Sequence, residues 1–212
     1  MSGGACGYNI INADEKYAAA LSGALFNEGQ SCGQCYKITC NSQSGSKFCR
    51  DGSTVTVVAT SFFPSERALL SDSSDTKLEN EHFHLSQSAW NEISLDESKV
   101  VPVLYQRVPC IKQGGVKFTI NGQAFFMVVL ISNVAGDGSI KSVSIKGSNT
   151  SWIVMSRNSG ANWHSNACLK EQSISFSVTL TDGQNLKFED VVPENWSFGQ
   201  TYSSPNPMQF NN

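Results

Sequence analysis

Two imidazoles stand two residues apart in the run His82-Phe83-His84, in a chain with three histidines. On a strand these side chains would share one face, which is the minimum arrangement for a metal site. No third ligand is evident nearby. We therefore expect no metal and no cofactor, with a hydrogen-bonded His82 and an exposed His84.

Carboxylates come just before these histidines, in a Ser/Asp/Glu-rich stretch over Ser71–Glu81. Glycoside hydrolysis needs a proton donor and usually a second carboxylate at a defined separation. The composition of this stretch is typical of an exposed loop. We favour a solvated loop over replacement catalytic acids for Asp72, Asp75, Glu79 and Glu81.

Six of the seven cysteines lie in the first 110 residues, which predicts disulfides formed in an oxidising compartment. Zinc would need a second close pair of ligands besides Cys32-x-x-Cys35. A redox-active pair would need strands interleaved with helices, so both readings are the less favoured alternatives. Met1–Gly4 lacks the regions of a signal peptide, and we expect a truncated sequence or a mature fragment of an exported protein. The six are Cys6, Cys32, Cys35, Cys40, Cys49 and Cys110, and Cys168 stands alone.

The charge pattern excludes several partners. The net charge is −3, and no run of Lys and Arg marks a nucleic-acid or anionic-membrane surface. The longest apolar stretch, Ala124–Ile131, is far below the roughly 20 residues of a membrane span.

The first half predicts a helix followed by strands. Asn12 and Glu15 resemble a capping pair, and Tyr17, Leu21 and Leu25 recur at helical spacing before Gly29. The runs Thr54–Phe62 and Val100–Val108 predict strands, and a short helix is expected near Ser86–Ile93.

The second half follows a candidate linker, Lys112–Gly115, and alternates with the period of strands. Asn121-Gly122 predicts a hairpin turn into Gln123–Val134. Ser173–Leu180 predicts Ile174 and its alternate neighbours inward and the intervening Ser and Thr outward. With further strands at Ile140–Gly147 and Leu186–Val192, this half predicts a β-sandwich.

Several longer runs carry a resemblance that extends from Gly3 to Tyr202. The chain resembles the plant expansins and is most similar to their α-expansin branch. The matching runs are Gly3–Tyr8, Ala19–Ser22, Ala24–Asn27, Ser31–Tyr36, His82-Phe83, Arg107–Cys110, Phe118–Gly122, Met155–Asn158 and Trp196–Thr201.

The resemblance implies a mainly β fold in two domains. Residues 1–111 would form a double-psi β-barrel related to family-45 glycosidases, with its first strand apparently missing. Residues 112–115 would be the linker, and residues 116–212 an immunoglobulin-like carbohydrate-binding sandwich. The implied disulfides are Cys6–Cys32, Cys35–Cys110 and Cys40–Cys49, each worth roughly 2–4 kcal/mol. Cys168 would be a buried free thiol.

The implied function is binding of cellulose or xyloglucan in the cell wall and non-hydrolytic loosening by a secreted, monomeric protein. Three departures from the family pattern affect this implied function. His84 replaces the family's acid, Phe63 replaces a cysteine, and Ser159 replaces an anchoring Trp. We expect weaker binding than in a typical member.

The predicted binding residues fall into two groups. In the barrel groove they are Tyr8, Thr60, Ser61, His82 and His84. On the sandwich they are Phe126, Trp152 and Trp163, since flat aromatic side chains stack on sugar rings. For both tryptophans a core position is the stronger alternative. Asn149, in Asn149-Thr150-Ser151, is the better of two glycosylation candidates.

Two further functions stay open. One is a degenerate paralogue that binds polysaccharide without loosening walls, which the lost groove and Trp residues favour. The other, less favoured because His84 stands where an acid would, is an endo-β-1,4-glucanase.

Overall fold

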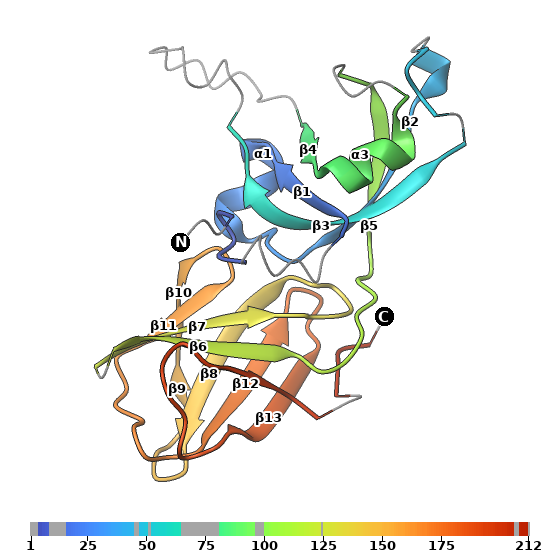
Figure 1. Ribbon diagram of the computed structural model, residues 1–212. Helices are drawn as coiled ribbons and strands as arrows, with labels where there is room; N and C mark the ends of the chain where they lie inside the picture. Colours follow the sequence, from blue (N-terminus) through green and yellow to red (C-terminus); the bar gives the residue numbers. More distant parts are fainter. Residues whose placement is uncertain are drawn as a thin grey trace, which may run out of the picture.

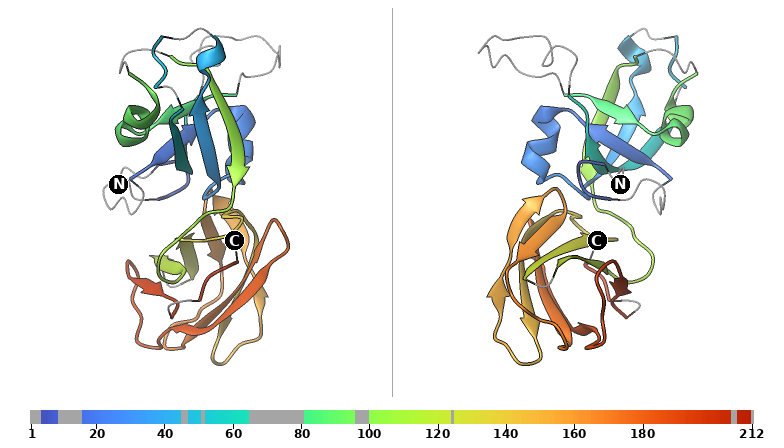
Figure 2. Two further views of the ribbon diagram at one scale, coloured as in Figure 1. Left: turned by 90° about the vertical axis from the view of Figure 1, so that its right-hand side faces the viewer. Right: turned by 60° about the vertical axis from the view of Figure 1, so that its left-hand side comes forward.

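The protein consists of two β-rich halves placed end to end (Figures 1 and 2). The structure is a computed structural model that describes residues 4–8, 16–44, 47–50, 52–64, 81–95, 100–123, 125–205 and 208–211. The mainly β fold is as predicted. The predicted loop Ser71–Glu81 lies outside the described residues except for Glu81.

The N-terminal half is one strongly curved five-stranded sheet in the order β4-β1-β3-β2-β5. Its outermost strands approach each other, since the rings of Phe83 on β4 and Tyr105 on β5 lie 5.0 Å apart. The sheet therefore closes as a barrel around its apolar side chains. Its strands are β1 (Ala18–Leu21), β2 (Cys35–Cys40), β3 (Thr54–Phe62), β4 (Phe83–Leu85) and β5 (Val103–Val108).

Helices are few in this half. The predicted helix α3 (Gln87–Ile93) is present, and Ser86 caps it by accepting a hydrogen bond from the Ala89 amide. The prediction of a helix before Gly29 is wrong. Residues 18–21 form β1 between β3 and β4, followed by α1 (Gly23–Phe26) and the 3₁₀ turns η2 (Asn27–Gly29) and η3 (Ser42–Ser44).

The C-terminal half is a sandwich of two sheets. One has the order β10-β11-β7-β6-β14 and the other β13-β12-β8-β9, and the core between them is almost entirely aliphatic and aromatic. Phe118 and Phe176, from opposite sheets, stack with ring centroids 4.5 Å apart. The strands are β6 (Lys117–Gln123), β7 (Phe126–Ser132), β8 (Ile140–Gly147), β9 (Ile153–Val154), β10 (Ser156–Ser159), β11 (Asn162–Ser165), β12 (Ile174–Leu180), β13 (Asn185–Val192) and β14 (Thr201–Ser203).

The first hairpin of the sandwich turns later than predicted. Asn121 and Gly122 lie within β6, and the last pair is Gln123 with Phe126. Gly122 is needed there for a different reason, because its φ is +107° and a Cβ would collide with the Phe126 carbonyl oxygen. On β12, Ile174 points inward as predicted. Ser175 is also buried, however, and its Oγ accepts a hydrogen bond from the Asp190 amide at 2.8 Å.

Disulfides brace the barrel half. The structure contains Cys6–Cys32, Cys35–Cys110 and Cys40–Cys49, the same pairs that the resemblance implies. Cys168 is a free thiol, but the prediction that it is buried is wrong, since it lies exposed on the loop before β12. Among the described residues no helix is long and apolar enough to cross a membrane.

Candidate functional site

His84 lies on the outer side of the barrel in a row with two small residues. Ala20 of β1 pairs with His84 of β4 on one side and with Ser61 of β3 on the other. Side chains of paired residues lie on the same face of a sheet. The row therefore places His84 and Ser61 on one face with Ala20 between them, and we call it the His84 surface.

Phe63 completes this surface. Its ring stacks on the His84 imidazole with centroids 4.5 Å apart and planes at 11°, and it meets His82 edge-on at 6.3 Å. The phenyl group is 39% exposed, so its rim faces water. Phe63 is therefore an aromatic group packed against both histidines. The sequence analysis did not assign Phe63 a role.

A second aromatic cluster lies behind the histidines, inside the barrel. Phe83 packs edge-on against Tyr36 and Tyr105, and the Tyr105 hydroxyl donates a hydrogen bond to Glu81. Burial and this carboxylate raise the pKa of Tyr105 to about 12, and burial also raises the pKa of Tyr36. Glu81 is thus bonded to a phenol. Among the described residues no group of three His, Cys, Asp or Glu side chains could hold a metal ion.

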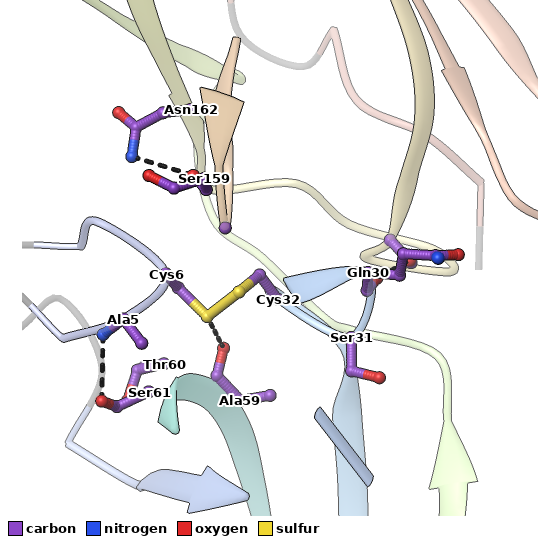
Figure 3. The surroundings of a disulfide bond; sticks show 12 residues. Ala5, Cys6, Gln30, Ser31, Cys32, Ala59, Thr60, Ser61, Ser159 and Asn162 are labelled. Atoms are coloured by element: carbon purple, nitrogen blue, oxygen red, sulfur yellow. Dashed lines mark hydrogen bonds between the residues drawn. A yellow bond between two sulfur atoms is a disulfide. The ribbon is translucent and has the colours of Figure 1, made fainter. Parts of the chain in front are cut away.

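The segment Gly4–Tyr8 lies between the two halves, and we call it the strap. Its Cys6 amide donates to Thr60 O, and its Ala5 amide donates to Ser61 Oγ at 3.0 Å (Figure 3). From the sandwich, the Ala161 amide donates to Cys6 O at 3.0 Å. The Cys6–Cys32 disulfide fastens the strap to the barrel.

Tyr8 belongs to this junction. It packs with the buried group Cys6, Cys32 and Ala161, and its hydroxyl lies near Gly33. Tyr8 therefore lies at the junction and packs on groups from both halves, and its role in a polysaccharide-binding groove stays a prediction. Thr60 lies one residue from Ser61, and its Oγ1 is 3.5 Å from Ala19 O.

An ion pair crosses the junction, and an arginine of the sandwich makes hydrogen bonds within the sandwich next to it. Arg107 of β5 forms an ion pair with Asp137 of the sandwich, and Thr181 donates to the same carboxylate. Arg157 of β10 donates to the carbonyls of Gly160 and Ile140 within the sandwich, and Gly160 lies against Cys6 of the strap. Burial lowers the pKa of Arg157, whose guanidinium also lies 4.5 Å from the centre of the Trp163 ring.

The sandwich presents Phe126 on the outer face of its first sheet. Met127 and Val129 point into the core, so Phe126, Val128 and Leu130 point out. Phe126 is 39% exposed, and the His164 ring lies 5.4 Å from it. We call this pair and the outward residues of β7 the Phe126 surface. His164 was missed, although its alternation with a buried Trp163 was the available signal.

The two predicted tryptophans lie elsewhere. Trp163 is 3% exposed within the sandwich core, so the prediction that it binds sugar is wrong. Trp152 is half-buried on the opposite face of the sandwich, beside Lys146 of β8. Phe126 and Trp152 therefore cannot contact one flat ligand together. Asn149 is exposed, and its use as a glycosylation site stays a prediction.

The strap connects the two candidate surfaces. Asn162 points out of the same sheet face as His164, and its amide lies against Gly7, where a Cβ would overlap it. From His84, a ligand path would run over Ser61, the strap and Asn162 to Leu130, which pairs with Asn162. Figure 3 shows Ser61, the strap and Asn162 close together.

A curved barrel joined through a strap to a two-sheet sandwich defines a class of two-domain β protein. Sequence comparisons show which family of that class the chain belongs to. Residues 116–193 match the family model of the expansin C-terminal domain, and residues 18–105 match the DPBB_1 model, described as lytic transglycolase. Expansin-A13 and Expansin-A25 of Oryza sativa subsp. japonica are each 48% identical over 95% of this chain, and 79% and 80% of their lengths are covered. Expansin-A12 of Arabidopsis thaliana is 46% identical over 95% of this chain and 80% of its own.

Solved structures agree on the fold. The apo Clavibacter michiganensis expansin gives a TM-score of 0.72 at 16% identity, over 99% of this chain and 89% of its own. A point mutant of that expansin in complex with cellohexaose gives 0.71 at 16% identity, over 96% and 88%. This chain belongs to the expansin family, and the named relatives place it with the α-expansins, as the resemblance predicted.

Proposed function

We propose that this protein acts outside the cell, in the plant cell wall, where it binds glucan chains of cellulose or xyloglucan-coated cellulose. It loosens the wall by disrupting noncovalent contacts between polysaccharides and cuts no bond. We place the barrel at residues 1–111 and the sandwich at 116–212, joined at 112–115. The 46–48% identity to expansins and the cellohexaose complex of the bacterial neighbour support this proposal.

The observation that carries the proposal is the ligand path from the His84 surface to the Phe126 surface. Each end presents an exposed aromatic ring packed on a histidine, Phe63 on His84 and Phe126 on His164. Such rings offer a flat apolar body to the C–H face of a sugar. Ser61 and Asn162 supply polar groups between the ends.

The absence of cleavage is proposed from the chemistry of the groups beside His84. The side chain there is an imidazole, whereas retaining and inverting glycosidases position two carboxyl groups across the scissile bond. Glu81, three residues away, is bonded to the Tyr105 hydroxyl. The Glu81 carboxylate therefore faces Tyr105 and is not directed at the row of Ala20 and Ser61.

The test uses three measurements on the full chain. Wall specimens under constant load should extend at acidic pH, cellulose should retain the protein in a pull-down, and soluble glucan should gain no reducing ends. Phe126→Ala should weaken cellulose retention by roughly tenfold, the effect of losing one stacked ring. Leu104→Ala removes a side chain that is 61% exposed on β5 and serves as the matched control.

Each outcome selects one function. Retention on cellulose without wall extension would establish the binding paralogue instead, a function that the loss of the Trp at position 159 also favours. New reducing ends would establish the endoglucanase. Equal retention of the wild type and Phe126→Ala would remove the Phe126 surface from the proposal.

A further inference from the structure

The outer face of the second sandwich sheet carries a tryptophan between two lysines. Trp152 directly precedes β9, and the register that pairs Ile153 with Ile145 places Trp152 beside Lys146. The Lys146 ammonium lies 4.9 Å from the centre of the Trp152 ring, and that of Lys187 on β13 lies 6.0 Å from it. This face is opposite the Phe126 surface, and it has no part in the path proposed for glucan.

The surroundings combine apolar and polar groups. Val154, two residues from Trp152 on the same strand face, is 77% exposed. Next to it, Ser144 of β8 pairs with both Val154 and Ser177 of β12, so hydroxyl groups border the apolar edge. The face therefore offers a ring, an aliphatic edge and hydroxyls, which suit a sugar.

The charges on this face favour an anion. Lys146 is paired with Glu189, its Nζ lying 3.1 Å from the carboxylate oxygen. The next carboxylate, Asp190, accepts a hydrogen bond from Ser173 Oγ at 2.7 Å. Lys187 has no carboxylate within ion-pair distance in the described part of the chain, so one ammonium is available to a ligand.

We propose that this face, the Trp152 surface, binds an acidic polysaccharide whose uronic-acid units bear one carboxylate each. A sugar ring stacks on Trp152, and the carboxylate of that unit or its neighbour pairs with Lys187. A neutral glucan would gain the stacking but would leave the ammonium without a partner. This site goes beyond the proposed glucan-binding function and does not depend on it.

The experiment compares two polymers with one backbone, polygalacturonate and the same polymer after reduction of its carboxyl groups. The full chain carries Asn149→Gln, so that no glycan stands three residues from Trp152. Affinity is measured by calorimetry at about 20 mM and about 500 mM salt, since screening weakens exposed ion pairs. The variants are Trp152→Ala, Lys187→Gln and Glu189→Gln.

Trp152→Ala should weaken binding of polygalacturonate by roughly tenfold at low salt. Lys187→Gln should weaken it by roughly two- to fivefold and reduce its salt dependence. Glu189→Gln should strengthen it, because Lys146 then loses its competing carboxylate. Lys37→Gln, which removes an equal exposed charge from the barrel, is the control and should leave the affinity unchanged.

Equal affinity for the charged and reduced polymers would overturn the proposal. So would Trp152→Ala and Lys187→Gln proteins that bind polygalacturonate as tightly as the wild type. Phe126→Ala should leave this binding intact while it weakens retention on cellulose. Failure of the acidic-polysaccharide site and failure of the glucan function are therefore seen in different measurements.

Discussion

His84 is the residue whose identity separates this chain most clearly from the pattern it resembles. Its ring is stacked on Phe63, the residue that we predicted at a cysteine position of that pattern. The two predicted departures are therefore in contact as one stacked pair. A stack of this kind holds the imidazole by packing, where a carboxylate would need water or a donor.

His84→Asp tests the role of this position in wall extension. The substitution places a carboxylate beside Ala20, in the row that ends at Ser61, and removes the stack on Phe63, and we expect faster extension of wall specimens at acidic pH. His84→Ala, which removes the stack without adding an acid, is the matched control. Equal extension by wild type, His84→Asp and His84→Ala would show that this position does not control loosening.

Tyr105 gives a pH dependence to stability. Its pKa is raised to about 12 by burial and by Glu81, so the folded protein keeps the phenol protonated where the unfolded chain, with a pKa near 10, has lost the proton. This contribution to the free energy of unfolding is complete below about pH 10 and is lost as the pH rises through about 12.

The measurement is urea unfolding between pH 9 and about pH 12 in a Cys168→Ser background, because a free thiolate would reshuffle disulfides. The free energy of unfolding should decline across this range, and Tyr105→Phe should reduce the decline. In the native protein, absorbance near 295 nm should show one fewer tyrosine ionising above about pH 11 after the substitution. Identical titrations of both proteins would contradict the assignment.

At the scale of elements, the alternation of apolar and polar residues along the sequence predicted strands reliably. Strands β3 and β8 begin and end where the sequence predicted, because long runs of alternating apolar and β-branched residues seldom form anything other than a strand. The segment before Gly29 was wrongly predicted to be a helix because Tyr17, Leu21 and Leu25 also recur at helical spacing. Its residues 18–21 instead fill a place between β3 and β4, a pairing with distant strands that no local pattern records.

Site residues could be predicted only in part, because their neighbours come from strands that are distant in the sequence. His84 and Ser61 were found from motifs, but their alignment through Ala20 is a property of the sheet order. Trp163 and Trp152 looked alike in the sequence, and only the two-sheet packing separates a core residue from a surface one. The place of Tyr8 at the junction could not be predicted, because it depends on the Cys6–Cys32 bridge that ties its segment to the barrel.

Gly122 provides a test of the corrected hairpin. Gly122→Ala adds a Cβ at φ +107° against the Phe126 carbonyl, and we expect a loss of at least about 3 kcal/mol in the free energy of unfolding. Gly183→Ala is the matched control, since Gly183 has φ +95° but nothing within 4 Å of its Cβ position. It should cost about 1 kcal/mol by urea unfolding. Equal losses for both variants would mean that β6 does turn at Asn121-Gly122.

At the scale of the whole molecule, main-chain hydrogen bonds join the two halves beside the side-chain contacts described above. Cys110 and Gly136 exchange amide hydrogen bonds at 2.7 and 3.0 Å, and Ala161 bonds to Cys6 O. Gly160 allows the latter contact, because a Cβ there would lie 2.5 Å from the Cys6 Cα. The linker is fastened as well, since Asn133 Nδ2 donates to the carbonyls of Gln113 and Gly115.

Gly160→Ala should therefore open the junction. Hydrogen exchange of the Ala161 amide, which donates to Cys6 O, should accelerate by roughly tenfold or more, corresponding to about 1.4 kcal/mol. Gly199→Ala, at φ +86° with nothing within 4 Å, controls for the backbone conformation. An unchanged exchange rate in Gly160→Ala would show that the halves tolerate separation at this point without loss of the bond.

The main-chain part of this junction, made of amides, carbonyls and glycines, has a consequence for how such a protein can diverge. Most substitutions change side chains, and they leave peptide groups where they are. Exposed residues such as Phe63, His84 and Phe126 can therefore be exchanged without removing the main-chain hydrogen bonds between the two halves. Selection can therefore change the exposed side chains of this protein while the main-chain contacts between its halves are kept.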